Sequence, residues 1–169
     1  MGEFRVEVLS ADHDRSAFDC GVAPLNDYLS TRAGQDVRRR VAACFVALEN
    51  VTGQVAGYYT LSASSIDVTD LPDDLRKKLP RYPTIPAILI GRLAVDHRFQ
   101  GRKLGEALLA DALKRMLNTE IAAYAAVVDA KDDSASRFYE RYGFRDLSLN
   151  PRRLFMPLSE KLRRLAAGS

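Results

Sequence analysis

The sequence predicts an α+β domain built around one central mixed, mostly antiparallel sheet flanked by helices. Two apolar runs at 41–48 and 54–62, separated by Asn50-Val-Thr-Gly53, predict an antiparallel hairpin in the first half. The second half alternates strands and helices, which is typical of parallel strands joined by a crossover helix. Because 169 residues suffice for one full hydrophobic core and are short for two, we expect a single domain over 1–169.

The first half supplies three further elements. Alternating apolar and polar residues over 4–9 predict a half-buried opening strand. A helix is expected after Pro24, ending near the arginine triplet 38–40, because apolar residues recur every four positions, at Leu25, Leu29, Ala33 and Val37. Residues 72–79 predict a short charged helix, followed by a loop that carries Pro80, Pro83 and Pro86.

The second half is expected to run strand, helix, strand, helix, strand. The predicted elements are a central strand at 87–95, an amphipathic helix at 101–118, a buried strand at 121–128, a short helix at 132–142 ended by Gly143, and strands from Phe144 and over 154–158. The basic tail, which includes 161–164, is expected to be helical or frayed. No internal repeat interrupts this order.

Composition narrows the class of protein. No apolar run approaches the ~18 residues of a membrane span, and the N-terminus shows no signal peptide, so we expect a cytoplasmic protein without a membrane partner. Cys20 and Cys44 fit no CxxC pattern, and with only His13 and His97 beside them we expect no metal site. The net charge of +3 is mild, but clustered basic residues permit a polyanionic partner.

The stretch from Arg92 to Leu109 carries the main functional signal. An apolar strand enters a basic turn with two glycines and continues directly into a helix, and free N–H groups at such a helix start favour anions. The turn 100–105 lacks both the Walker ending and the G-x-G-x-x-G spacing. It predicts a pyrophosphate cradle, with charge added by Arg98, Arg102 or Lys103. The alternative is an ordinary strand-to-helix turn with exposed basic residues.

This turn resembles the acetyl-CoA motif Q/R-x-x-G-x-G/A of the GNAT acyltransferase superfamily. Gln100 and Gly105 match its first and last positions, whereas Lys103 stands where the middle glycine is usual. The resemblance implies the GNAT acyl-CoA acyltransferase fold and acetyl-CoA as acetyl donor. It also implies that the main chain of Leu93, Ala94 and Val95 binds the pantetheine arm, and that Gly101 and Leu104 belong to the cradle.

A second segment, 132–144, is similar to the superfamily pattern N-x-x-A-x-x-F-Y-x-x-x-G-F, with Asp132 in place of asparagine. Helical spacing predicts a core-facing stripe of Ala135, Phe138 and Tyr142, with Tyr139 about 100° from Phe138 at its edge. At this edge the Tyr139 hydroxyl can point to a bound ligand, which makes Tyr139 the candidate general acid. The alternative is an aromatic side chain that packs on the core with its hydroxyl in solvent. The resemblance also implies that Asp132 and Ser134 contact the cofactor.

The likeness becomes more specific over the rest of the chain. Segments 18–29, 57–65 and 85–96 are similar to the GNAT toxins of bacterial type II toxin-antitoxin modules, so that nearly the whole chain is covered. This resemblance implies transfer of acetyl from acetyl-CoA to the α-amino group of an aminoacyl-tRNA, which stops translation. It further implies a homodimer that a ribbon-helix-helix antitoxin neutralises.

The chemistry of this reaction needs few side chains. An α-amino group has a reference pKa near 8, so much of the substrate is already a neutral nucleophile at pH 7 and a strong general base is dispensable. The tRNA backbone needs cations. The candidate cations for the tRNA backbone are Arg38, Arg39, Arg40, Lys77, Lys78 and Arg92. The first three would also be favourable at the end of a helix without any RNA. A Cys20–His13 nucleophilic pair is a weaker alternative.

Two other functions stay open on the sequence alone. A GNAT enzyme could instead acetylate a small amine or a protein N-terminus, and the motifs do not distinguish these acceptors. A degenerate, non-catalytic GNAT interaction module is suggested by Lys103 and Asp132, the two departures from the motifs.

Overall fold

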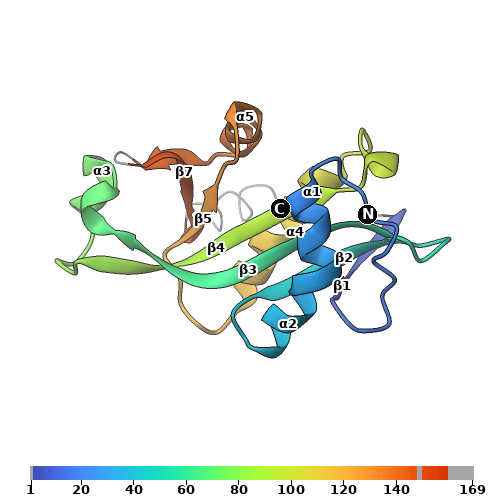
Figure 1. The fold of residues 1–169 in the computed structure, drawn as a ribbon. Helices are drawn as coiled ribbons and strands as arrows, with labels where there is room; N and C mark the ends of the chain where they lie inside the picture. Colours follow the sequence, from blue (N-terminus) through green and yellow to red (C-terminus); the bar gives the residue numbers. More distant parts are fainter. Residues whose placement is uncertain (1, 148–149, 160–169) are drawn as a thin grey trace. The chain divides into compact units, whose positions relative to one another are not determined.

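The computed structural model describes residues 2–147 and 150–159 (Figure 1). Seven strands form one sheet in the order β1-β2-β3-β4-β5-β7-β6. The pairings β1–β2, β2–β3, β5–β7 and β6–β7 are antiparallel, and β4–β5 is parallel, so the predicted mixed, mostly antiparallel sheet is confirmed. The chain divides into two compact units, Met1–Ser62 with Gly91–Lys114, and Ala63–Ile90 with Arg115–Ser169.

The first unit begins with a hairpin and its neighbouring strand. Strand β1 (Phe4–Val8) pairs with β2 (Ala43–Glu49), which pairs with β3 (Val55–Asp67) across the turn at 50–54. The first unit also holds the end of β4 (Thr84–Val95), the short helix η3 (His97–Phe99) and most of α4 (Leu104–Asn118). The predicted hairpin is therefore confirmed.

A helical segment covers one face of this hairpin. It runs as α1 (Ala23–Asp27), the π-helical turn η1 (Tyr28–Arg32) and α2 (Ala33–Arg38), and ends at the arginine triplet as predicted. The Ala33 N–H donates to the Tyr28 carbonyl five residues earlier, which defines the π turn. Leu29 and Ala33 are fully buried and share a core with Val46 and Tyr58.

Helix α4 packs on the hairpin through a contact that requires a glycine. A Cβ at Gly57 of β3 would lie 2.9 Å from the Ala94 carbonyl oxygen of β4 and 3.0 Å from Leu108 Cδ1 of α4. Leu104, Leu108 and Leu113 are buried, in agreement with the predicted amphipathic face. The absent side chain at Gly57 lets the end of β4 and the start of α4 approach β3 closely.

The second unit carries the remaining elements. They are the short helices η2 (Val68–Asp70) and α3 (Asp73–Arg76), strand β5 (Ala125–Asp129), helix α5 (Asp133–Arg141), and strands β6 (Arg145–Leu147) and β7 (Asn150–Pro157). Ile66, Ile85, Val127 and Phe155 are central to its core. Gly143 adopts φ +100° directly after the α5 C-cap, as expected of a residue that ends a helix.

Several predicted boundaries were wrong. Strand β3 continues to Asp67, and β4 begins at Thr84, so that Pro86 lies in a strand rather than in a loop. Strand β5 begins only at Ala125, and Ile121 is 80% exposed instead of buried. The basic tail at 160–169 lies outside the described residues. Within the described part of the chain, no helix has the length and apolarity that a membrane crossing needs.

Candidate functional site

The end of β4 is the frame of the candidate cofactor site. Strand β5 pairs with Ala87–Ile90 of β4, and this pairing stops five residues before β4 ends at Val95. Leu93, Ala94 and Val95, the three residues predicted to bind the pantetheine arm, lie in this extension. The Asp96 N–H donates to the Ala56 carbonyl at 2.8 Å, which holds the end of β4 to β3.

The turn after β4 presents free main-chain donors at the start of α4. Among the described residues, none accepts a hydrogen bond from the N–H groups of 101–106, and the first amide of the helix with a partner is that of Ala107. Gly101 and Lys103 both have a left-handed backbone, with φ of +82° and +62°. Such alternating turns direct successive N–H groups into one concavity, which suits a phosphate group.

A hollow of about 630 Å³ opens beside this turn. It is lined by Gly101, Arg102, Lys103, Leu104 and Ala107 from the turn and α4, and by Gly2, Glu3 and Phe4 from the N-terminal segment. Arg102 lies 3.9 Å from the Glu3 carboxylate, and its guanidinium is 5.5 Å from the centre of the Phe99 ring. Lys103 has no ion pair among the described residues, so its ammonium is available to an anion in this hollow.

Asp96 anchors the turn to its surroundings. Its side chain is fully buried and accepts hydrogen bonds from the Asp19 N–H at 3.0 Å, and from the N–H, Nε and Nη2 of Arg98 at 2.8–2.9 Å. Burial opposes ionisation of this carboxyl, but the hydrogen bonds from Arg98 and from the two main-chain amides outweigh it and lower the pKa of Asp96. A buried carboxylate thus fixes the conformation of the turn.

The same contacts change the expected roles of two predicted ligands. The Arg98 guanidinium is hydrogen-bonded to the Asp96 carboxylate, so it stabilises the turn. Gln100 donates from Nε2 to the Val95 carbonyl at 3.1 Å and closes the turn onto the end of β4. Of the side chains predicted to touch phosphate, Arg102 and Lys103 are those that line the hollow.

Helix α5 carries the second predicted motif. Asp132 is its N-cap and accepts the Ala135 N–H through Oδ1 at 2.8 Å, so this side chain starts the helix. The residue predicted to lie at the centre of the core-facing stripe of this helix was wrong. Tyr139 is buried, with 8% of its surface exposed, whereas Ala135, Phe138 and Tyr142 are only half-buried. The stripe is therefore rotated toward Tyr139, whose ring packs edge-on against Phe144 with the ring centres 5.4 Å apart.

The environment of Tyr139 favours the protonated phenol. Burial raises the pKa of Tyr139 to about 12, because the phenolate would lose hydration there. Among the described residues, none forms a hydrogen bond with its hydroxyl. The side chain therefore keeps its proton at neutral pH.

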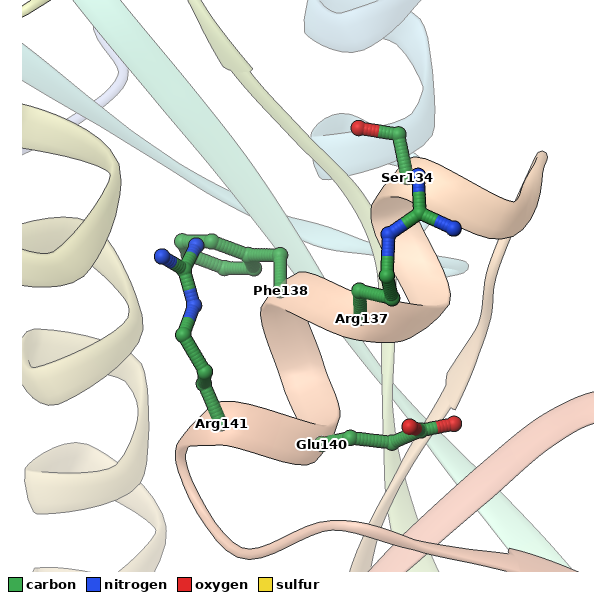
Figure 2. Close-up of a pocket in the computed structure, with 5 residues that line it drawn as sticks. All are labelled: Ser134, Arg137, Phe138, Glu140 and Arg141. Carbon is green, nitrogen blue, oxygen red and sulfur yellow. The ribbon is translucent and has the colours of Figure 1, made fainter.

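A hollow of about 580 Å³ lies along the outer side of α5 (Figure 2). It contains the predicted Ser134 together with Arg137, Phe138, Glu140 and Arg141, none of which was predicted as a site residue. Figure 2 shows the Arg141 guanidinium beside the Phe138 ring, 5.9 Å from its centre, while Glu140 points away from both. Arg141 follows Phe138 by three residues and Arg137 by four, so the three side chains share one side of the helix. This spacing is the sequence signal that could have identified the hollow.

The predicted RNA-binding cations fall into three different environments. The Arg92 guanidinium lies 3.5 Å from the centre of the buried Tyr28 ring, and the Tyr28 hydroxyl donates to Asp36. Arg38, Arg39 and Arg40 are exposed at the end of α2. Lys77 and Lys78 are exposed in the turn that follows α3. Arg92 thus has a structural partner, whereas the other five cations are turned to solvent.

The weaker alternative of a Cys20–His13 nucleophilic pair has no geometric support. His13 is hydrogen-bonded through Nε2 to Glu7 at 2.9 Å and accepts the Ser10 N–H through Nδ1. The Cys20 thiol instead contacts the Val22 carbonyl at 3.7 Å. The described residues also contain no cluster of three or more His, Cys, Asp or Glu side chains that could hold a metal ion.

The fold and the turn define an acyltransferase of the GNAT type. A strand that extends beyond its pairing with β5, a turn of free amides and a helix that begins at that turn are an arrangement suited to a nucleotide-linked acyl group. Known proteins agree with this class, because a sequence profile described as an acetyltransferase (GNAT) domain matches residues 84–154.

Individual relatives are more specific. A tRNA-acetylating toxin of Mycobacterium tuberculosis (strain ATCC 25618 / H37Rv) is 34% identical over 154 residues, which cover 90% of each chain. The solved structure of AtaT complexed with acetyl-methionyl-tRNAfMet superposes with a TM-score of 0.86 at 32% identity, over 96% of this chain and 99% of that one. The chain therefore belongs to the GNAT acetyltransferases, in the family of the tRNA-acetylating toxins.

A third relative is bound to both the expected cofactor and an antitoxin in one structure. It is a tyrosine-to-phenylalanine variant of the AtaT toxin bound to acetyl-CoA and to the C-terminus of the antitoxin AtaR. Its TM-score is 0.80 at 27% identity, with 96% of this chain and 98% of that chain covered.

Proposed function

We propose that this protein transfers the acetyl group of acetyl-CoA to the α-amino group of an aminoacyl-tRNA and thereby blocks translation. The observation that carries the proposal is the row of free N–H groups at 101–106, in a chain that is similar over 90% of its length to a tRNA-acetylating toxin. A translation inhibitor of this kind acts in the cytoplasm, where aminoacyl-tRNA is used.

The residues of the turn fit the pyrophosphate of acetyl-CoA. The amides of Gly101, Arg102, Lys103, Leu104 and Gly105 supply donors without side-chain rearrangement, and the start of α4 adds the positive end of its dipole. Arg102 and Lys103 add positive charge from the rim of the hollow. The main chain of Leu93, Ala94 and Val95 is suited to the amide-rich pantetheine arm, because the pairing of β4 with β5 ends at Ile90.

Acetyl-CoA supplies a thioester whose thiol is the leaving group, and the protein has to hold a proton for it. Tyr139 is the proposed general acid: its pKa of about 12 keeps the phenol protonated until the developing thiolate takes the proton. An N–H of the β4 extension polarises the thioester carbonyl. The acceptor amine needs no dedicated base, since its reference pKa is near 8. Ser134, on the rim of the α5 hollow, and the helix-capping Asp132 are proposed to contact the cofactor, the latter through its remaining oxygen.

The partners follow from the relatives. We propose that the protein is neutralised by a cognate antitoxin, by analogy with the AtaT toxin bound to the C-terminus of AtaR. From the family resemblance of the sequence we further propose that this antitoxin is of the ribbon-helix-helix type and that the protein acts as a homodimer. Exposed cations at Arg38, Arg39, Arg40, Lys77 and Lys78 supply charge for the tRNA backbone. Arg92, whose guanidinium lies over the Tyr28 ring, is the sixth cation that we propose for the tRNA.

A competition assay tests the acceptor. Charged tRNA, spermidine and an N-terminal peptide are mixed with labelled acetyl-CoA and the protein, and the products are separated by mass. We expect label on the aminoacyl ester. Label on spermidine or on the peptide with none on the tRNA would assign a different acetyltransferase, and no binding of acetyl-CoA at millimolar concentration in calorimetry would assign a non-catalytic module.

A further inference from the structure

Residues 76–83 form a basic turn between α3 and β4 that the reaction chemistry does not use (Figure 1). Three of its cations, Lys77, Lys78 and Arg81, are exposed, and so is Tyr82 between them and the strand. Tyr82 has 64% of its surface exposed, and it is the single exposed tyrosine among the seven of the chain, all of which are described.

The main chain of the basic turn is ordered. The Lys78 N–H donates to the Leu75 carbonyl at 3.1 Å, the Tyr82 N–H donates to the Pro80 carbonyl at 2.8 Å, and the Pro83 carbonyl accepts the Val68 N–H at 3.0 Å. Leu75 and Leu79 pack on the core of the second unit. Because these two leucines and the prolines at 80 and 83 fix the turn, its exposed side chains are presented at a low cost in backbone entropy.

One of the four cations of the basic turn is compensated by a carboxylate. Arg76 is paired with Asp73, and the neighbouring Asp74 is paired with Arg145 at 3.4 Å. Lys77, Lys78 and Arg81 have no carboxylate partner among the described residues. The two aspartates of α3 are thus occupied by other arginines, and a group of three cations without a carboxylate partner among the described residues remains around Tyr82.

We infer that the basic turn binds an unpaired nucleotide of the tRNA substrate, with Tyr82 stacking on its base and Lys77, Lys78 and Arg81 contacting the adjacent phosphates. An exposed aromatic ring among free cations matches both parts of a single-stranded nucleic acid, the base face and the backbone charge. An acidic peptide would use the cations but would gain nothing from the aromatic face. The inference rests on the proposed function and deepens it, because it names the recognition surface for the RNA.

The experiment measures tRNA binding by fluorescence anisotropy over a range of salt concentrations, together with acetylation kinetics on charged tRNA. Tyr82→Ala is expected to weaken tRNA binding by about fivefold or more and to raise KM for the aminoacyl-tRNA at unchanged kcat. Tyr82→Phe keeps the stacking face and should stay within about twofold of the unaltered protein. Lys77→Gln and Lys78→Gln should each lower the slope of log affinity against log salt by about 0.7–0.9.

Lys114→Gln is the matched control, because Lys114 is also an exposed lysine without an ion pair among the described residues, and it should leave the affinity unchanged. Unaltered tRNA affinity of Tyr82→Ala overturns the inference, as does a Tyr82→Phe loss equal to that of Ala. Loss of binding to a polyglutamate peptide with tRNA binding intact would assign the turn to a protein partner. If the unaltered chain acetylates charged tRNA while Tyr82→Ala keeps its KM, the inference alone fails; if the unaltered chain neither binds nor acetylates tRNA, both proposals fail.

Discussion

Lys103 shows how one residue can depart from a motif and keep its backbone. The position that usually carries glycine has φ +62° here, in the left-handed region where an L side chain costs about 1–2 kcal/mol. The lysine accepts this conformation because its side chain reaches solvent and the amide, which the cradle needs, is unchanged. The departure from the family pattern is therefore a local strain with an added charge, and the N–H groups of 101–106 have no acceptor among the described residues.

Lys103→Gly is expected to keep the affinity for acetyl-CoA within about tenfold, or roughly 1.4 kcal/mol. The glycine relieves the left-handed strain but removes the ammonium from the rim of the hollow. Isothermal titration with acetyl-CoA measures the change. A loss well beyond tenfold would instead identify the ammonium as a principal phosphate ligand.

Tyr139→Phe is expected to reduce acetyl transfer at least about 100-fold while the affinity for acetyl-CoA stays within about twofold, because the hydroxyl serves proton transfer and not docking. Tyr142→Phe, which removes a phenol from the end of the same helix, is the control and should stay active. A fully active Tyr139→Phe variant would exclude Tyr139 from the reaction.

The turn of the candidate site can be singled out from the sequence, but the contacts that its side chains make in the fold cannot. The turn at 100–105 was predicted because glycines and cations between a strand and a helix are a local pattern. Arg98 and Gln100 were assigned to the cofactor because the sequence does not show their hydrogen bonds to Asp96 and to the Val95 carbonyl, which form only in the folded turn. Tyr139 was placed at the edge of the stripe because residues 100° apart on a helix can both face a core, and only packing selects one.

At the level of the elements, the junction of β3, β4 and α4 depends on Gly57. A Cβ there would lie 2.9 Å from a main-chain oxygen and 3.0 Å from Leu108, so β4 or α4 would have to shift. Since Leu93, Ala94 and Val95 end β4 and Leu104 begins α4, such a shift would move both sides of the cradle.

Gly57→Ala is therefore expected to lower the free energy of unfolding by about 1–3 kcal/mol and to weaken acetyl-CoA binding. Urea denaturation and calorimetry give the two values. Gly34→Ala in α2 is the control: its Cβ would meet the flexible end of Arg38 at 3.4 Å, and removing a helical glycine should leave stability equal or slightly higher. Equal stability of Gly57→Ala and the unaltered chain would contradict the close-approach argument.

Elements with a strong period were predicted well, and their ends less well. The hairpin and α4 follow from runs of apolar residues that one face of the fold buries. The last residues of β3, Ala63-Ser-Ser-Ile-Asp67, contain a single large apolar side chain and no regular alternation, so the sequence pattern does not show that the strand continues. Ile121 illustrates the opposite error, because an apolar residue before a buried strand does not have to be buried itself.

At the scale of the whole molecule, buried tyrosine and cysteine side chains determine how the free energy of unfolding changes at alkaline pH. Burial raises the pKa of Tyr28, Tyr58 and Tyr139, the last to about 12, and it raises the pKa of Cys44 from 9.0 to about 12. Each folded pKa lies above the unfolded one. The unfolded chain therefore loses these protons first as the pH rises, and the stability present below pH 9 declines between about 9 and 12.

We expect the free energy of unfolding to fall steeply above about pH 10, with each such group contributing up to about 1.4 kcal/mol per pH unit. Urea titrations near pH 8 and above pH 10 measure the slope. Tyr139→Phe removes one of the buried groups whose pKa is raised, so it should make the fall in the free energy of unfolding with pH less steep. A stability independent of pH over this range would contradict the role of burial.

The π turn η1 has a consequence for how such chains vary in evolution. In a regular α-helix, a stripe that steps by four residues drifts by about 40° per step, so Leu25 and Val37 would point about 120° apart. The wider turn at Tyr28–Arg32 absorbs much of this drift, and Leu29 and Ala33 stay on the same core. A π turn is equivalent to one amino acid inserted into a helix. Relatives that lack it should therefore align with a one-residue gap between 28 and 32 and carry a stripe that steps by three and four in alternation.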